Sequence, residues 1–134
     1  MDGENKRKTI NQCNTIAMYV IRGQIPSKSN CYKIVNINGH AKLAKQKVLT
    51  EYEKNFYIQC PERGRMVKGY FKLTAKIYYS SNRPDLDNSL KILLDCLQLT
   101  KTIENDRYCV HIDIQKFIDK KEPRIEYEVT PIEF

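Results

Sequence analysis

The stretch RPDLDNSLKILLDCLQLT, residues 83–100, predicts a helix that begins beside a pair of acidic side chains. Pro84 disfavours a helical conformation in the residue before it and therefore sets where the helix can begin. Leucines then recur every three or four residues and share one helix face: Leu90, Leu93, Leu94 and Leu97. We expect a helix over about residues 87–99, with this leucine face buried and Asp87 and Lys91 along the neighbouring face.

Asp85 and Asp87 are one residue apart at the start of this predicted helix, where two carboxylates repel each other. One interpretation is structural, because acids favour the N-terminal end of a helix and one of them can act as its N-cap. The other is a metal site. A third acid, Asp106, follows the helix, and it meets the first two if the next strand runs back beside the helix start. Three such carboxylates are hard oxygen ligands that suit Mg²⁺ or Mn²⁺.

A calcium-binding loop is the rival metal site, because DLDNSLKILLDC (residues 85–96) begins like an EF-hand. The pattern fails at two positions that such a loop needs. Leu90 stands where the tight turn requires glycine, and Cys96 stands where a glutamate binds the calcium ion. We therefore reject this class of site.

The rest of the chain predicts one α+β domain, residues 15–134, after a polar N-terminal arm at residues 1–14. Alternating and β-branched runs predict strands at residues 15–23, 32–37 (a short one), 68–81, 108–117 and 124–131. The last two strands are expected to form a hairpin. An amphipathic helix is expected over residues 41–60. The predicted order is β-(β)-α-β-α-β-β, with one mixed sheet and two helices.

Charge and cysteine content limit the class of protein. The chain of 134 residues carries 23 basic and 16 acidic residues, a net charge of +7, which suits a polyanion such as nucleic acid. Five cysteines, an odd number without CxxC spacing, argue against a disulfide framework or a zinc finger and for reduced thiols in the cytoplasm. No apolar run, secretory signal or glycine-rich nucleotide motif is present, so we expect no membrane and no nucleotide cofactor.

The segment from Asp85 to Lys116 resembles the RusA-type family of Holliday-junction resolvases. The family pattern is acid-x-acid-Asn, then a lysine, a leucine-rich helix with a further aspartate, and an acid near the start of a strand. The matching residues in this chain are Asp85, Asp87, Asn88, Lys91, Asp95 and Asp106. Family members often have two adjacent acids before the last pair of strands, whereas this chain has Asn105-Asp106, and Glu104 is the alternative acid.

The resemblance implies a RusA-like fold and a homodimeric endonuclease that depends on Mg²⁺, with Mn²⁺ able to substitute. Such an enzyme resolves four-way DNA junctions by paired nicks in recombination and repair. The resemblance also implies catalytic roles for Asp85, Asp87, Lys91 and Asp106, with the three aspartates holding the metal. Lys91 has an ordinary alternative, an i, i+4 ion pair with Asp87 or Asp95. Family members often occur in bacteria and their phages, which suggests a cytoplasmic protein encoded by a phage or prophage.

DNA contacts are expected near the acids, on the following strand and on the loop after the first strand, from Lys28, Asn30, Tyr32, Arg83 and Lys116. For the loop residues, a solvated loop is equally compatible with the sequence. For Lys116, the alternative is an outward-facing strand position. Two other functions stay open: a non-catalytic DNA-binding protein that keeps this fold, and a less selective nuclease for flaps or forks.

Overall fold

The computed structural model describes residues 18–133, so the predicted arm and the first residues of the predicted first strand lie outside the described part. The main sheet has four strands, in the spatial order β1 (Tyr19–Arg22), β6 (Arg124–Pro131), β4 (Phe71–Tyr79) and β5 (Cys109–Ile118). β4 and β5 are parallel, whereas β6 is antiparallel to both of its neighbours. The sheet is therefore mixed, as the sequence predicts.

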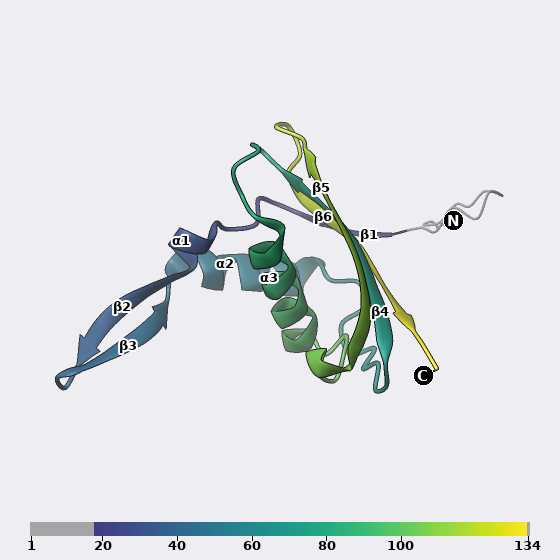
Figure 1. Cartoon of the computed structure of the whole chain (residues 1–134), viewed down its shortest axis with the longest axis horizontal. Coiled ribbons are helices and arrows are strands. Elements are labelled where there is room, and N and C mark those ends of the chain that lie inside the picture. The colour runs from purple at the N-terminus through teal and green to yellow at the C-terminus, as the bar shows by residue number, and fades with distance from the viewer. Residues whose placement is uncertain (1–17, 134) are drawn as a thin grey trace.

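Helices cover one face of this sheet, namely α2 (Lys47–Gln59) and α3 (Leu86–Leu99) (Figure 1). The central strand β4 shows why this arrangement forms. Its odd-numbered residues, from Phe71 to Tyr79, are buried beneath the helices, and its even-numbered residues are half-buried on the opposite face. This alternation has the period of a strand with one face in the core.

The buried face of α3 differs slightly from the expected leucine face. Leu93 and Leu97 are fully buried, as predicted, but Leu90 and Leu94 pack only at the margin of the core. The remaining inner positions belong to Ser89, Ile92 and Cys96. The helix is therefore rotated slightly from the predicted orientation, and it leaves Asp87 exposed.

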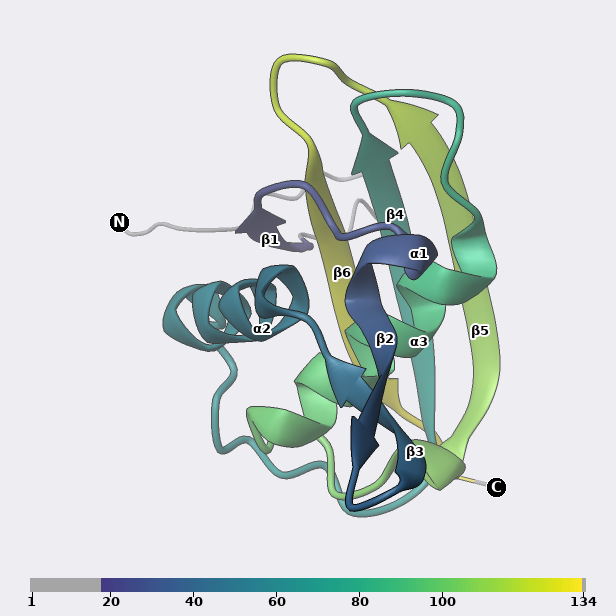
Figure 2. The same cartoon turned by 90° about the vertical axis from the view of Figure 1, so that its left-hand side faces the viewer.

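A second sheet of two strands projects from the rest of the molecule (Figures 1 and 2). It consists of β2 (Tyr32–Ile37) and β3 (His40–Lys45), which pair antiparallel. Asn38 and Gly39 connect them with positive φ angles of 54° and 80°. Asparagine followed by glycine is the favoured sequence for such a tight hairpin turn. The predicted short strand at residues 32–37 is confirmed.

The helix expected over residues 41–60 is wrong at its start, because residues 40–45 form β3 and α2 begins at Lys47. The spacing of Ala41 and Ala44, three residues apart, is typical of one helix face, whereas in β3 these two residues lie on opposite faces, so the periodicity is misleading here. Pairing with β2 favours the strand, since the backbone groups of β3 are then satisfied by the facing strand.

The hairpin predicted for the last two strands is also wrong. β5 and β6 do not pair with each other, because β4 lies between them and pairs with both. α3 crosses from the end of β4 to the start of β5, which makes these two strands parallel. β4 takes the centre because its core face is apolar throughout, whereas most residues of the edge strand β5 are exposed. Alternation along a strand predicts its faces, but not its neighbours.

Two short helical segments complete the chain: α1 (Lys28–Cys31) precedes β2, and the 3-10 helix η1 (Asp106–Tyr108) precedes β5. The sequence prediction contained neither. The α+β class and the mixed sheet are confirmed, with a third, short helix beside the two predicted ones.

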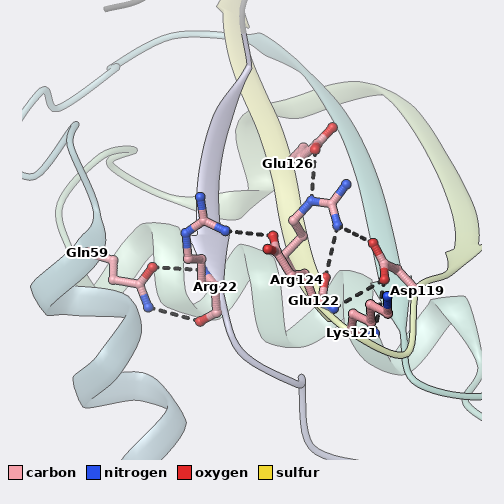
Figure 3. A network of polar contacts seen from close by, with 7 residues as sticks. All are labelled: Arg22, Gln59, Asp119, Lys121, Glu122, Arg124 and Glu126. Atoms are coloured by element: carbon pink, nitrogen blue, oxygen red, sulfur yellow. Dashed lines mark hydrogen bonds and ion pairs between the residues drawn. The ribbon is translucent and has the colours of Figure 1, made fainter.

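Polar contacts fasten the end of the sheet from which residues 80–85 leave β4 (Figure 3). The Arg22 amide donates to Gln59 Oε1 at 2.7 Å, and the Arg22 carbonyl accepts from Gln59 Nε2 at 2.9 Å. The Arg22 guanidinium pairs with Glu122 at 2.9 Å, and Arg124 pairs with Asp119 at the same distance. These contacts join β1 to α2 and hold the turn between β5 and β6.

No helix within residues 18–133 is both long and apolar enough to cross a lipid bilayer. Cys31, Cys60, Cys96 and Cys109 are free thiols, as expected, and the first three are buried. Cys13 lies outside the described residues.

Candidate active site

Asp85 and Asp87 lie at the start of α3, immediately after the segment that leaves β4. Asp85 has the extended backbone of an N-cap, with φ −95° and ψ 145°, yet its carboxylate makes no capping hydrogen bond. The Asp87 carboxylate accepts a hydrogen bond from the Asn88 backbone amide at 2.9 Å. Both residues are exposed. Helix capping therefore does not account for Asp85, and both carboxylates face solvent beside the positive end of the helix dipole.

Tyr79, the last residue of β4, holds the backbone of Asp85 in place. Its hydroxyl donates to the Asp85 carbonyl at 3.2 Å and forms a second hydrogen bond with the Ser89 hydroxyl. Burial raises the pKa of Tyr79, the bond to Ser89 opposes this rise, and the carboxylates of Asp85 and Asp87 add to it. Tyr79 therefore stays protonated at neutral pH and serves as a hydrogen-bond donor.

Tyr79→Phe is expected to lower the free energy of unfolding by about 1–3 kcal/mol, because the buried Ser89 hydroxyl and the Asp85 carbonyl lose their partner. Urea denaturation measures this change. Tyr78→Phe is the matched control, since that hydroxyl lies on the half-buried face of the sheet beside Glu126 and Arg124, its contact with Glu126 is long at 3.5 Å, and the expected change is below about 0.5 kcal/mol. Equal stability of the two variants would show that Tyr79 does not anchor the start of α3.

A surface hollow of about 380 Å³ adjoins Asp85. Its lining combines the segment before α3 with α1 and consists of Ser27, Lys28, Ser29, Arg83, Pro84, Asp85 and Asn88. Asn88 fastens the two sides together, because its Nδ2 donates to the Pro26 carbonyl at 3.1 Å. Two of the residues expected to contact DNA, Lys28 and Arg83, thus lie beside Asp85. Phosphate groups that approach the acids would meet these positive charges.

Lys116 reaches the same region from the end of β5. Its Nζ donates to the Asn82 carbonyl at 2.9 Å and lies 5.7 Å from the centroid of the Tyr79 ring. Lys116 is therefore not an outward-facing strand residue, and it helps to fix the segment that carries Asp85. The other two residues predicted to contact DNA lie farther along: Asn30 is exposed in α1, and Tyr32 begins β2 and packs at the core margin.

Asp106 lies at the opposite end of α3. Its amide donates at 3.0 Å to Gln98 Oε1, in the last turn of that helix. Asp87 and Gln98 are separated by about 16 Å along the helix axis, given the rise per residue of an α-helix. Within residues 18–133, no three histidine, cysteine, aspartate or glutamate side chains are close enough to hold a metal ion together. The expectation that the three aspartates meet within one chain is therefore wrong.

The direction of β5 explains this outcome. β5 does run back beside α3, as expected, but Asp106 precedes its first residue, so Lys116 rather than Asp106 reaches the helix start. Asn105 caps the short helix η1, because its Oδ1 accepts from the Arg107 amide at 3.0 Å. The neutral residue beside Asp106 thus has a structural role. Glu104, the alternative acid, lies at the same end of α3, where its amide donates to the Val67 carbonyl at 2.9 Å.

Lys91 forms the ordinary ion pair that the sequence allowed, with its Nζ 3.3 Å from Asp95 Oδ2. Both side chains are substantially exposed, so the pair contributes only about 0.3–0.5 kcal/mol. Asp95 belongs to a different hollow, of about 250 Å³, which Lys45 and Glu53 also line. Because this ion pair is weak, Lys91 can leave Asp95 and contact a phosphate that lies nearby.

The structure is thus a small α+β domain in which paired aspartates, surrounded by basic residues, begin the helix after the central strand. A protein-family model described as endodeoxyribonuclease RusA matches residues 17–130. The chain belongs to this family, as the resemblance of its sequence predicts. Membership indicates a junction-resolving endonuclease, which in this family is metal-dependent and binds branched DNA. No curated protein shows significant similarity to the chain.

Proposed function

We propose that the protein is a homodimeric, Mg²⁺-dependent endonuclease that resolves four-way DNA junctions by paired nicks. It would act in recombination and repair in the bacterial cytoplasm and would be encoded by a phage or prophage. The observation that carries the proposal is the uncapped carboxylate of Asp85 beside that of Asp87, in a chain of the RusA family. Lys28, Arg83 and Lys116 would hold phosphates around these acids.

The residues at the start of α3 fit a small divalent cation. Mg²⁺ usually takes one or two carboxylates from a protein and keeps waters or substrate phosphate oxygens in its other positions. Asp85 and Asp87 supply two exposed carboxylates, and neither is buried in an ion pair. A cation bound there stabilises negative charge on the scissile phosphate and lowers the pKa of a bound water. Mn²⁺, which prefers similar oxygen ligands, would substitute.

A second copy of the chain would supply the third aspartate. A twofold axis beside α3 that sets the two helices antiparallel would bring Asp106 of one chain toward Asp87 of the other. This side of the molecule has an apolar surface for such a contact. Ile112 and Ile118 are 41% and 52% exposed, and they pair with buried residues of β4, so they lie on the face that carries α3. Leu90 and Leu94, at the core margin, extend the same surface.

This arrangement matches the substrate. A twofold dimer has two equivalent sites, and a four-way junction has near-twofold symmetry, so each site would act on one of two opposed strands. Paired nicks then follow from the symmetry of the enzyme without any further element.

Lys91→Gln is expected to lower the rate of nicking by about a hundred-fold, because a charge one turn from Asp87 would stabilise the developing charge on the phosphate. Asp95→Asn is the matched control, since it breaks the same ion pair at 3.3 Å and leaves the lysine in place. Single-turnover nicking of a labelled junction measures both. If the two variants nick at the same rate, Lys91 has only its structural role.

A nicking assay on a synthetic four-way junction tests the proposed function. With Mg²⁺ or Mn²⁺, the wild-type protein should introduce symmetric nicks in two opposed strands, and a fork or flap of the same sequence should be cut far more slowly. Similar rates on forks and junctions would indicate the less selective nuclease. Binding without cleavage in either metal would indicate the non-catalytic alternative.

A further inference from the structure

The β2–β3 hairpin has no role in the site described so far, although it is the most exposed part of the fold. Its two strands pair along six residues each and project beyond α1 and α2 (Figures 1 and 2). Most side chains on both strands are exposed. Strands of this length extend by about 20 Å, given the rise per residue of a strand. A lone two-stranded hairpin is marginally stable in water, which favours a role in binding.

The charged side chains in and around the hairpin are basic. The sequence has no acid from Ser27 to Thr50, and it has five lysines there: Lys28, Lys33, Lys42, Lys45 and Lys47. Lys45 and Lys47 are paired with glutamates of α2, at 2.9 and 3.8 Å. Within residues 18–133, Lys33 and Lys42 form no ion pair, so their charges are available to a partner.

The strand register places these two lysines together. Lys33 is opposite Ala44, and Lys42 is opposite Val35, so both lysines lie on one face of the hairpin, diagonally across from each other. His40, opposite Ile37, is on the same face near the turn. The other face carries the cross-strand pair Ile34 and Leu43, which are 72% and 70% exposed. One face of the hairpin, which we call the cationic face, therefore carries Lys33 and Lys42 beside Val35 and Ile37. The other face exposes Ile34 and Leu43 beside Asn36 and Lys45.

The base of the hairpin is fixed beside the candidate active site. The Gln46 amide donates to the Cys31 carbonyl at 2.8 Å, which closes the base. Lys28, in the helix that leads into β2, lines the hollow next to Asp85. The hairpin thus has a defined position relative to the acids rather than that of a free arm.

We propose that the β2–β3 hairpin is a second DNA-binding element, whose cationic face contacts the phosphates of one duplex arm of the branched substrate. This inference rests on the proposed function. A two-stranded ribbon fits the major groove of B-DNA. Its reach of about 20 Å corresponds to roughly six nucleotides, given the rise per nucleotide of one strand. Charge complementarity favours DNA over a second copy of the chain, because two cationic faces repel each other.

The salt dependence of junction binding tests this inference. Fluorescence anisotropy, measured without divalent metal so that no cleavage occurs, gives the slope of log K against log salt. The double variant Lys33→Gln/Lys42→Gln should lower the magnitude of that slope by about 4, because the proposed dimer has two hairpins and each of the four lost phosphate contacts removes about 0.9. The control Lys72→Gln/Lys76→Gln removes the same charge from the face of the sheet away from the helices and should leave the slope unchanged.

Arm length gives an independent readout. The difference in salt slope between the hairpin variant and wild type should disappear on junctions whose arms are shortened to about four base pairs. Such arms are shorter than the reach of the hairpin. An unchanged slope for the hairpin variant, or equal losses in both double variants, would overturn the inference.

The test also separates this inference from the proposed function. If wild type binds and nicks the junction but the hairpin slope is unchanged, only the hairpin inference fails. If wild type does not bind the junction, both fail. The remaining outcome is that the hairpin contacts a second copy of the chain. Sedimentation of the variant Ile34→Ser/Leu43→Ser tests it. If this variant no longer forms a dimer, and the lysine variant keeps the wild-type slope, the hairpin is a dimer contact and the DNA-binding inference is overturned.

Discussion

Asp87→Asn is expected to lower the rate of junction nicking by about a thousand-fold, the upper end of the range for loss of one stabilising group at a reacting centre. The substitution keeps the size of the side chain but removes the anionic ligand that the proposed cation needs. Asp87 is exposed at the start of α3, so the fold should be preserved. Single-turnover nicking with Mg²⁺ measures the rate, and anisotropy without metal should show junction binding that is no weaker than that of wild type.

Asp113→Asn is the matched control for this prediction. Asp113 is an exposed acid on β5, and it pairs with Thr74, whose side chain lies on the face of the sheet away from the helices. The control therefore removes one negative charge from the protein without approaching the site. Its nicking rate should stay within about twofold of wild type, the range of an ordinary surface substitution. If Asp87→Asn were as active as this control, the paired aspartates would have no part in the reaction.

Local features of the fold follow from the sequence because each depends on few neighbours. The helix over residues 86–99 and the strand over residues 124–131 lie where their spacing of apolar residues predicts. The turn at Asn38-Gly39 also lies where its two residues predict it, since both adopt positive φ at low cost. The order of strands in the sheet, in contrast, depends on which strand can be buried on both edges, and the pattern along a single strand does not contain that information.

The position of Asp106 shows how a prediction from motif spacing can fail within one chain. A helix of fourteen residues separates its ends by about 20 Å, because its rise is fixed by backbone geometry. An acid that follows the end of such a helix meets acids at its start only if the chain travels back that far first. Here Asp106 comes before β5 begins its return, so the spacing that identifies the family does not bring its acids together in one protomer.

Several residues that shape the site were missing from the sequence prediction. Tyr79 supports Asp85 through a hydroxyl at the end of a strand, and nothing distinguishes it in sequence from the adjacent Tyr78. Gln24 is similar, because its Oε1 accepts from the Ser80 amide at 3.0 Å across a separation of 56 residues. Lys33 and Lys42 carried a signal that was available, namely a basic stretch without acids, but the predicted helix began too early, at residue 41, and divided that stretch.

The second large effect is expected on nicking activity when two inactive variants are mixed. Asp106→Asn should be as inactive as Asp87→Asn, because each proposed site needs both residues. In a dimer that pairs one chain of each variant, one site receives both substitutions, and the other receives Asp87 and Asp106 intact from different chains. Random pairing of equal amounts makes half of the dimers mixed, so about a quarter of all sites should be complete. These sites should produce single nicks rather than paired ones.

This mixing experiment tests the central claim most directly, namely that two chains build each metal site. The two variants are unfolded together, refolded as an equal mixture, and assayed for nicking of a labelled junction with Mg²⁺. Each variant treated alone and refolded wild type are the controls. The account predicts that activity returns in the mixture to about a quarter of the wild-type rate of first nicking. A mixture as inactive as either variant alone, with mixed dimers shown to be present, would contradict it.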